Sequence, residues 1–119
     1  MQPFYENIEH ETLKNNAYRN VRYTDEHMQI VYMSLLPLEE IGSEIHPHTT
    51  QFFRVEKGDG LLVLHNNKKY VLKDGMGFSI PAGTRHNIIN TSTTEKMKLY
   101  TIYAPPQHPA HTFQEIKLE

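Results

Sequence analysis

The chain has 119 residues, a formal net charge of -2 at pH 7 and no cysteine. This length fits one domain with a single core. The small net charge excludes the basic field that holds nucleic acid or anionic lipid, and the lack of cysteine excludes disulfides, thiolate nucleophiles and zinc-finger sites. We therefore expect one domain over residues 1–119, with neither nucleic acid nor membrane as a partner.

The chain is expected to be almost entirely β-structure. Residues 1–17 are polar and rich in asparagine, and predict an irregular arm or an exchanged edge strand. From residue 18 onward, short β-branched and aromatic runs alternate with turn residues, which is typical of an all-β sandwich or barrel. The expected strands cover residues 20–23, 28–36, 44–48, 51–57, 60–65, 68–72, 77–80, 86–90 and 97–103.

Glycine and asparagine predict the turns that separate these strands. Residues 57–60 and 65–68 are tight hairpin signals, because Gly and Asn tolerate left-handed backbone conformations. The tail, residues 104–119, begins with Ala-Pro-Pro. Proline has no amide hydrogen to donate to a ladder, so we expect this tail to leave the sheet and wrap around the outside.

Three histidines form the pattern with the clearest chemistry. His46 and His48 lie two residues apart in an expected strand, so both side chains should point to the same face, and His86 begins a later strand. Imidazoles bind divalent transition metals well, and three of them leave coordination positions open for water or substrate. The alternative is that they are hydrogen-bonded interior residues in a barrel without a metal. Their number and spacing favour a metal site.

The sequence around these histidines resembles the cupin superfamily. Residues 75–90 match the second cupin motif, G-x5-P-x-G-x2-H-x3-N, at all five fixed positions. The first motif, G-x5-H-x-H-x3,4-E-x6-G, is matched less closely by Gly42, His46, His48 and Gly58, because only three residues separate Gly42 from His46 where the motif has five. Gln51 then stands where the family usually has a metal-binding glutamate, after a loop shortened to two residues. The chain resembles a small single-domain cupin, and the resemblance implies a double-stranded β-helix or jelly-roll barrel.

The resemblance also implies a single bound ion of Fe, Mn, Ni, Zn or Cu. Its expected ligands are His46, His48, Gln51 and His86, although an odd separation between His48 and Gln51 requires a bend between them. Glu44 shares the expected face of His46 and His48, and remains an alternative to Gln51. Three imidazoles and an amide carry no charge, so the ion would act as a strong Lewis acid.

Apolar and aromatic residues are expected to line the space around the ion. Phe53 and Val55 lie two and four residues after Gln51, so all three should share one face of the strand. Tyr32, Met33 and Tyr100 lie on other expected strands and are predicted to form more of the cavity wall. The sequence assigns no residue a catalytic role.

Three function classes follow. The favoured one is a metal-dependent isomerase or lyase acting on a small polar molecule such as a sugar or uronate derivative. The alternatives are an iron- or copper-dependent dioxygenase and a non-enzymatic protein that binds a small ligand. Small cupins commonly pair, so we expect a homodimer. Because neither a signal peptide nor a membrane span is recognisable, we expect a cytoplasmic protein.

Overall fold

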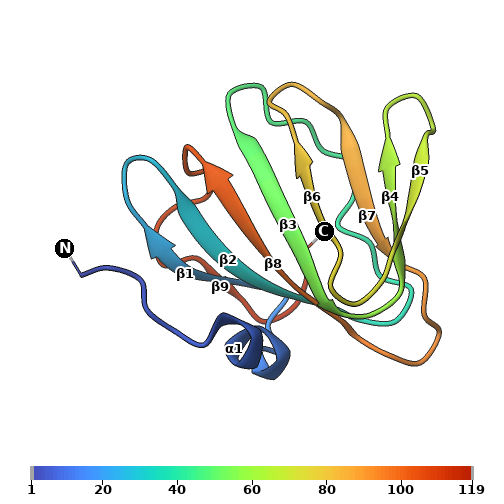
Figure 1. The fold of residues 1–119 in the computed structure, drawn as a ribbon, viewed down its shortest axis with the longest axis horizontal. Coiled ribbons are helices and arrows are strands. Elements are labelled where there is room, and N and C mark those ends of the chain that lie inside the picture. Colours follow the sequence, from blue (N-terminus) through green and yellow to red (C-terminus); the bar gives the residue numbers. More distant parts are fainter. Residues whose placement is uncertain (1, 119) are drawn as a thin grey trace.

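The computed structural model describes residues 2–118, which form two antiparallel sheets and one short helix (Figure 1). The larger sheet has the strand order β6-β3-β8-β2-β1-β9 and the smaller has the order β5-β4-β7. The helix is α1 (Ile8–Lys14), and the strands are β1 (Arg19–Thr24), β2 (Gln29–Leu35), β3 (Thr50–Lys57), β4 (Gly60–Leu64), β5 (Lys69–Leu72), β6 (Gly77–Ile80), β7 (His86–Asn90), β8 (Met97–Ala104) and β9 (Phe113–Gln114).

The core lies between the two sheets and is built from alternating side chains. In β3, Phe53 and Val55 are buried and belong to the core cluster, as does Met33 of β2. The smaller sheet contributes Leu62 and Ile88 to the same cluster. Successive side chains of a strand point to opposite faces of the sheet, so every second residue reaches the core. This explains why apolar residues alternate with polar ones in the sequence of these strands.

The expected all-β class is confirmed, and eight of the nine expected strands are present with ends within one residue. The exception is the strand over residues 44–48. Only Glu44 forms a β-bridge there, with His86, while Pro47 and His48 lie in a turn. Proline cannot donate to a ladder, so the segment cannot continue as a regular strand.

The N-terminal segment is a helix rather than the irregular arm or edge strand that the sequence suggested. The side chain of Asn7 caps α1 by accepting a hydrogen bond of 3.1 Å from the backbone amide of His10. Glu9 and Glu11 occupy the first turn and Lys14 the last, which complements the helix dipole. A helix of seven residues has too few turns to show a hydrophobic period, so the sequence pattern did not reveal it.

The tail leaves β8 at its prolines, as expected, but then returns to the sheet. Residues of β9 pair with β1, so the expectation that the tail only wraps the outside was wrong. Gln29 fixes the connecting segment, since its Oε1 accepts from the amides of Gln107 and His108 and its Nε2 donates to the carbonyl of His108. These bonds place the side chain of His108 beside the interior.

Two of the five residues expected to line the interior lie on the opposite face of the larger sheet. Tyr32 pairs with Tyr100, and Tyr100 pairs with Arg54, so the three share the outer face. The hydroxyl of Tyr32 donates to Glu6 in the N-terminal segment at 2.6 Å. The expectation for Tyr32 and Tyr100 is therefore corrected: each lies one residue out of phase with the inward positions of its strand.

Candidate metal centre

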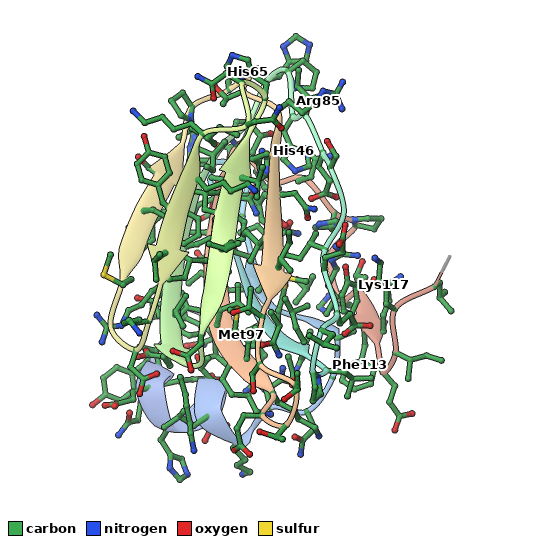
Figure 2. The ribbon with its side chains drawn as sticks, turned by 90° about the vertical axis from the view of Figure 1, so that its right-hand side faces the viewer. His46, His65, Arg85, Met97, Phe113 and Lys117 are labelled. Carbon is green, nitrogen blue, oxygen red and sulfur yellow. The ribbon has the colours of Figure 1, made fainter. Side chains whose placement is uncertain are left out.

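The residues of the centre come from several elements and meet at one end of the two sheets. Figure 2 shows His46 at the same end as His65 and Arg85, with Met97 toward the other end. Glu44 and His86 exchange two backbone hydrogen bonds of 2.8 and 2.9 Å, and the amide of Gly83 donates to the carbonyl of His46 at 2.8 Å. The segment before β3 is thus fastened to the start of β7, which brings the side chains of Glu44, His46 and His86 together.

These three side chains could hold one ion. One ligand atom from each of Glu44, His46 and His86 can be chosen so that all lie within 4.8 Å of one another. Both histidines are buried, and their ring centroids are 5.5 Å apart. Two imidazoles and a carboxylate at such separations are the donor types that divalent transition metals use.

Three buried polar atoms of His46, His86 and Gln51 have no hydrogen-bond partner among the described residues. They are Nε2 of His46, Nε2 of His86 and Oε1 of Gln51. A buried polar atom without a partner costs free energy, and native structures rarely leave several of them together. All three atoms carry lone pairs suited to metal coordination, so the residues present fit an ion that Glu44, His46, Gln51 and His86 would share.

Neighbouring groups fix the orientation of two of these donors. The Nδ1 atom of His86 lies 2.9 Å from the carbonyl oxygen of Thr84. A carbonyl can only accept, so this nitrogen carries the hydrogen and Nε2 keeps a free lone pair. Likewise, Nε2 of Gln51 donates to Oγ1 of Thr101 at 3.0 Å, which leaves Oε1 as the atom of this amide without a partner.

The electrostatic surroundings favour the protonation states that a metal requires. Burial raises the pKa of Glu44, but its interaction with His46, supported by Arg19 and His86, outweighs burial and leaves the pKa below the usual value. Burial lowers the pKa of His86. At neutral pH the site therefore offers a carboxylate and an unprotonated His86.

His48 lies outside this group. Its turn exposes it to solvent, and the described residues whose donor atoms converge are Glu44, His46 and His86. The expectation that His46 and His48 point the same way along one strand was wrong, because no strand forms at that point. The geometry gives no support to His48 as a ligand.

The structure also corrects the alignment of the first cupin motif. If its two histidine positions are placed at Glu44 and His46, four residues separate His46 from Gln51 and six separate Gln51 from Gly58, as the motif requires. The leading glycine of the motif then falls on Leu38, which has a positive φ of 64°. Glycine favours that conformation, so this placement agrees with the backbone. The motif permits three or four residues between its second histidine and its glutamate position. Choosing four would have placed Glu44 at the first histidine position from the sequence alone.

Tyr103 and His108 lie beside the donors on the side of the tail. The ring of Tyr103 packs edge-on to His46, with centroids 5.9 Å apart, and its hydroxyl lies 3.3 Å from Nε2 of His108. Burial raises the pKa of Tyr103 and lowers the pKa of His108 to about 4. Both groups are therefore neutral at pH 7.

An apolar pocket of about 270 Å³ lies between β6 and the hairpin of β4 and β5. Phe78 lines it and stacks on Phe53, and the ring of Phe53 in turn contacts His86 edge-on. The pocket is thus linked to the metal centre by a row of ring contacts. Its other lining residues include Leu62, Leu64, Tyr70, Leu72 and Ile80.

Comparison with known proteins agrees with this fold. The sequence profile of the cupin domain matches residues 31–103. The uncharacterized protein L612 of Acanthamoeba polyphaga mimivirus is 51% identical over 91% of this chain, and the uncharacterized protein YrkC of Bacillus subtilis is 42% identical over 99% of it. The chain spans 69% and 66% of the lengths of these two relatives, so both are longer.

A solved structure and a more distant relative add to this comparison. The crystal structure of BH2720 from Bacillus halodurans superposes with a TM-score of 0.92 at 46% identity, covering 96% of this chain and 89% of that one. The probable oxidoreductase virH of Hypocrea virens is 33% identical over 62% of this chain, which is 35% of that protein. Among the described residues, no helix is long and apolar enough to cross a membrane.

Proposed function

Since the chain belongs to the cupin family, and since its interior gathers two imidazoles and a carboxylate, we propose that it is a metal-dependent enzyme that oxidises a small polar molecule with dioxygen. The observation that carries this proposal is the convergence of Glu44, His46 and His86 on one point. Two histidines and one carboxylate with open positions are the ligand set of non-haem iron oxygenases.

The structure brings Glu44 to the metal centre and leaves His48 outside it, and this difference changes which candidate function is favoured. Three imidazoles and an amide would leave the ion its whole charge, which favours Lewis-acid chemistry. A carboxylate at the ion lowers that net charge and stabilises the higher oxidation state of iron, so redox chemistry becomes the better match. The name of the relative virH, a probable oxidoreductase, is in keeping with this order.

The residues of the chain have distinct parts in the proposed reaction. A bound iron would supply the redox chemistry. His46, His86 and Glu44 would hold it, and Gln51, whose amide nitrogen donates to Thr101, would offer a further oxygen donor. The buried core around Phe53 excludes water from one side.

The hydroxyl of Tyr103 is the group best placed to act on a bound substrate. It stands beside His46 and is protonated at neutral pH, so it can donate a hydrogen bond to a substrate oxygen. The contact with His108 keeps it in position.

The test is oxygen consumption by protein loaded anaerobically with one equivalent of Fe(II), measured with a panel of small hydroxy acids, sugars and uronates. We expect substrate-dependent oxygen uptake in the wild type and none in His46→Ala. Metal binding without oxygen uptake on any compound, together with isomer or elimination products from Mn(II)- or Zn(II)-loaded protein detected by NMR, would overturn the oxidative proposal.

That second outcome defines the remaining candidate, an isomerase or lyase acting on a sugar or uronate derivative. It is favoured by Gln51, whose neutral oxygen adds no further negative charge to the ion. In that reaction the same four residues would hold the ion, and Tyr103 would move the proton.

A further inference from the structure

The apolar pocket of about 270 Å³ lies between β5, an edge strand of the smaller sheet, and β6, an edge strand of the larger one. Its wall is the inner face of three strands. Leu62 of β4 pairs with Tyr70 of β5, and alternate residues of a strand share a face, so both residues face the core side. The apolar side chains of this wall are those of Leu62, Leu64, Tyr70, Leu72, Phe78 and Ile80.

The floor of the pocket belongs to the core, whereas its mouth is open to solvent. Leu62, Leu72 and Ile80 are at most 4% exposed, and all three are members of the core cluster. Tyr70 and Met76, which also line the pocket, are 42% and 46% exposed. Exposed apolar side chains around a hollow that reaches the core mark a binding site more strongly than single apolar residues scattered on a surface. A concave, mostly apolar site of this kind is typical of small-molecule binding.

The size and the side chains of the pocket fit one kind of occupant. An apolar cavity of about 150 Å³ holds one benzene ring, so a pocket of about 270 Å³ has room for two fused rings. Phe78 and Tyr70 offer aromatic surfaces for stacking or edge contacts, and the sulfur of Met76 favours contact with an aromatic ring. Among the described residues, no charged side chain lines the pocket. A charged occupant would therefore lose its hydration without gaining a partner.

From these observations we infer that the pocket binds a small uncharged aromatic molecule of one or two rings, at a site separate from the metal centre. His86 contacts the ring of Phe53, and Phe53 stacks on Phe78 with centroids 5.0 Å apart, but only Phe78 of these three lines the pocket. The occupant therefore lies one ring beyond the nearest metal donor. It also lies against Thr84, whose carbonyl is bonded to His86, so the site adjoins the turn that carries this donor.

The test titrates indole into ¹⁵N-labelled protein and follows the backbone amides by NMR, with glucose as a polar probe of similar size. We expect saturable indole binding that shifts amides of β5 and β6, and no saturable shift of these amides with glucose. Leu64→Trp fills the pocket with its own rings and should weaken indole binding about tenfold or more. Val63→Trp is the matched control. The neighbouring residue of β4 faces the other side of the sheet, so the affinity should stay within about twofold of the wild type.

Tyr70→Ala provides a second variant, in case Leu64→Trp does not fold. Tyr70 lies at the mouth of the pocket, so its loss should leave the circular dichroism spectrum unchanged. It should weaken indole binding about three- to tenfold, as for the loss of an aromatic contact. Equal indole affinity in the wild type and Tyr70→Ala, or amide shifts confined to other strands, would overturn the inference. Shifts of β5 and β6 that follow protein concentration alone would overturn it too, because the occupant would then be a second copy of the chain.

Discussion

The donor atom of His86 faces the interior because its other ring nitrogen is already engaged with the carbonyl of Thr84. The same arrangement recurs at Gln51, whose amide nitrogen is held by Thr101. Such contacts orient each donor without an ion, so metal binding at this site would have less side-chain entropy to overcome. Ordinary residues outside the ligand set thus decide which atoms are offered to the ion.

At this scale, the identity of the ligand next to His46 can be tested directly. Glu44→Ala should lower the metal-to-chain ratio well below that of the wild type, since it removes the only carboxylate among the converging donors of the described residues. His86→Ala should have the same effect. His48→Ala should keep the wild-type ratio, because the side chain lies in an exposed turn. Elemental analysis of the purified variants after dialysis measures these ratios. Metal loss in His48→Ala, with retention in Glu44→Ala, would restore the three-histidine centre.

The N-terminal segment is held to the larger sheet by a small polar network. The carboxylate of Glu6 accepts from Tyr32 and from Arg22, each at 2.6 Å, and the guanidinium of Arg22 lies above the ring of Tyr32. This network covers the outer face of β2 and explains how Tyr32 can be fully buried away from the core.

Glu6→Gln should lower the free energy of unfolding by about 0.5–1 kcal/mol, because the ion pair is partly exposed and screened by water. Burial raises the pKa of Glu6, but hydrogen bonds from Tyr32 and Arg22 outweigh it and lower the pKa. The contribution is therefore present above the unfolded pKa near 4.5 and is lost as the pH falls through the lower folded value. Urea denaturation at pH 7 and at pH 3 measures it. Glu9→Gln, on the exposed helix, is the matched control and should change little at either pH.

Close packing between the two sheets depends on Gly60 at the start of β4. A Cβ at this position would collide with Cε of Met97 in β8 and with the carbonyl oxygen of Ile89 in β7. The methionine end can move, but the carbonyl belongs to a paired strand and cannot do so without breaking the ladder.

Gly60→Ala is accordingly expected to destabilise the protein by about 1–3 kcal/mol, as for overpacking of a core. Thermal or urea denaturation followed by circular dichroism provides the measurement. Ser79→Ala, at an exposed position of β6, adds no new side-chain atom and should lie within about 0.5 kcal/mol of the wild type. Equal stability of Gly60→Ala and the wild type would show that β4 can shift away from β7.

For the molecule as a whole, stability depends on pH through two neutral histidines, His86, which is buried, and His108, which is half-buried. Burial lowers the pKa of His86 below 6.5, and lowers the pKa of His108 to about 4. Both folded values lie below the unfolded value, so the unfolded chain takes up protons first as the solution becomes more acidic. The contribution of these two neutral histidines to the free energy of unfolding is fully present above pH 6.5 and is lost progressively as the pH falls toward 4.

The metal-free protein should therefore lose stability between pH 6.5 and 4, and His108→Gln should lose about 1–2 kcal/mol less over that interval. Urea denaturation at half-unit steps of pH measures both slopes. His65→Gln, in the exposed β4–β5 turn, is the control and should follow the wild type. Identical slopes for the wild type and His108→Gln would show that His108 titrates normally in the folded protein.

The amino-acid sequence by itself determined the all-β fold, the ends of most strands and the position of His86. Those features depend on local patterns, namely alternation of apolar residues, turn residues that accept positive φ, and a motif contained within residues 75–90. The tertiary structure decided the rest. The side chain of Glu44 converges with those of His46 and His86 and that of His48 does not, because Pro47 interrupts the strand and the pairing of Glu44 with His86 sets the direction of the side chains. The sequence likewise did not show that Tyr32 lies on the outer face of the larger sheet, which follows from the pairing of the strands and from its contact with Glu6 in the N-terminal segment.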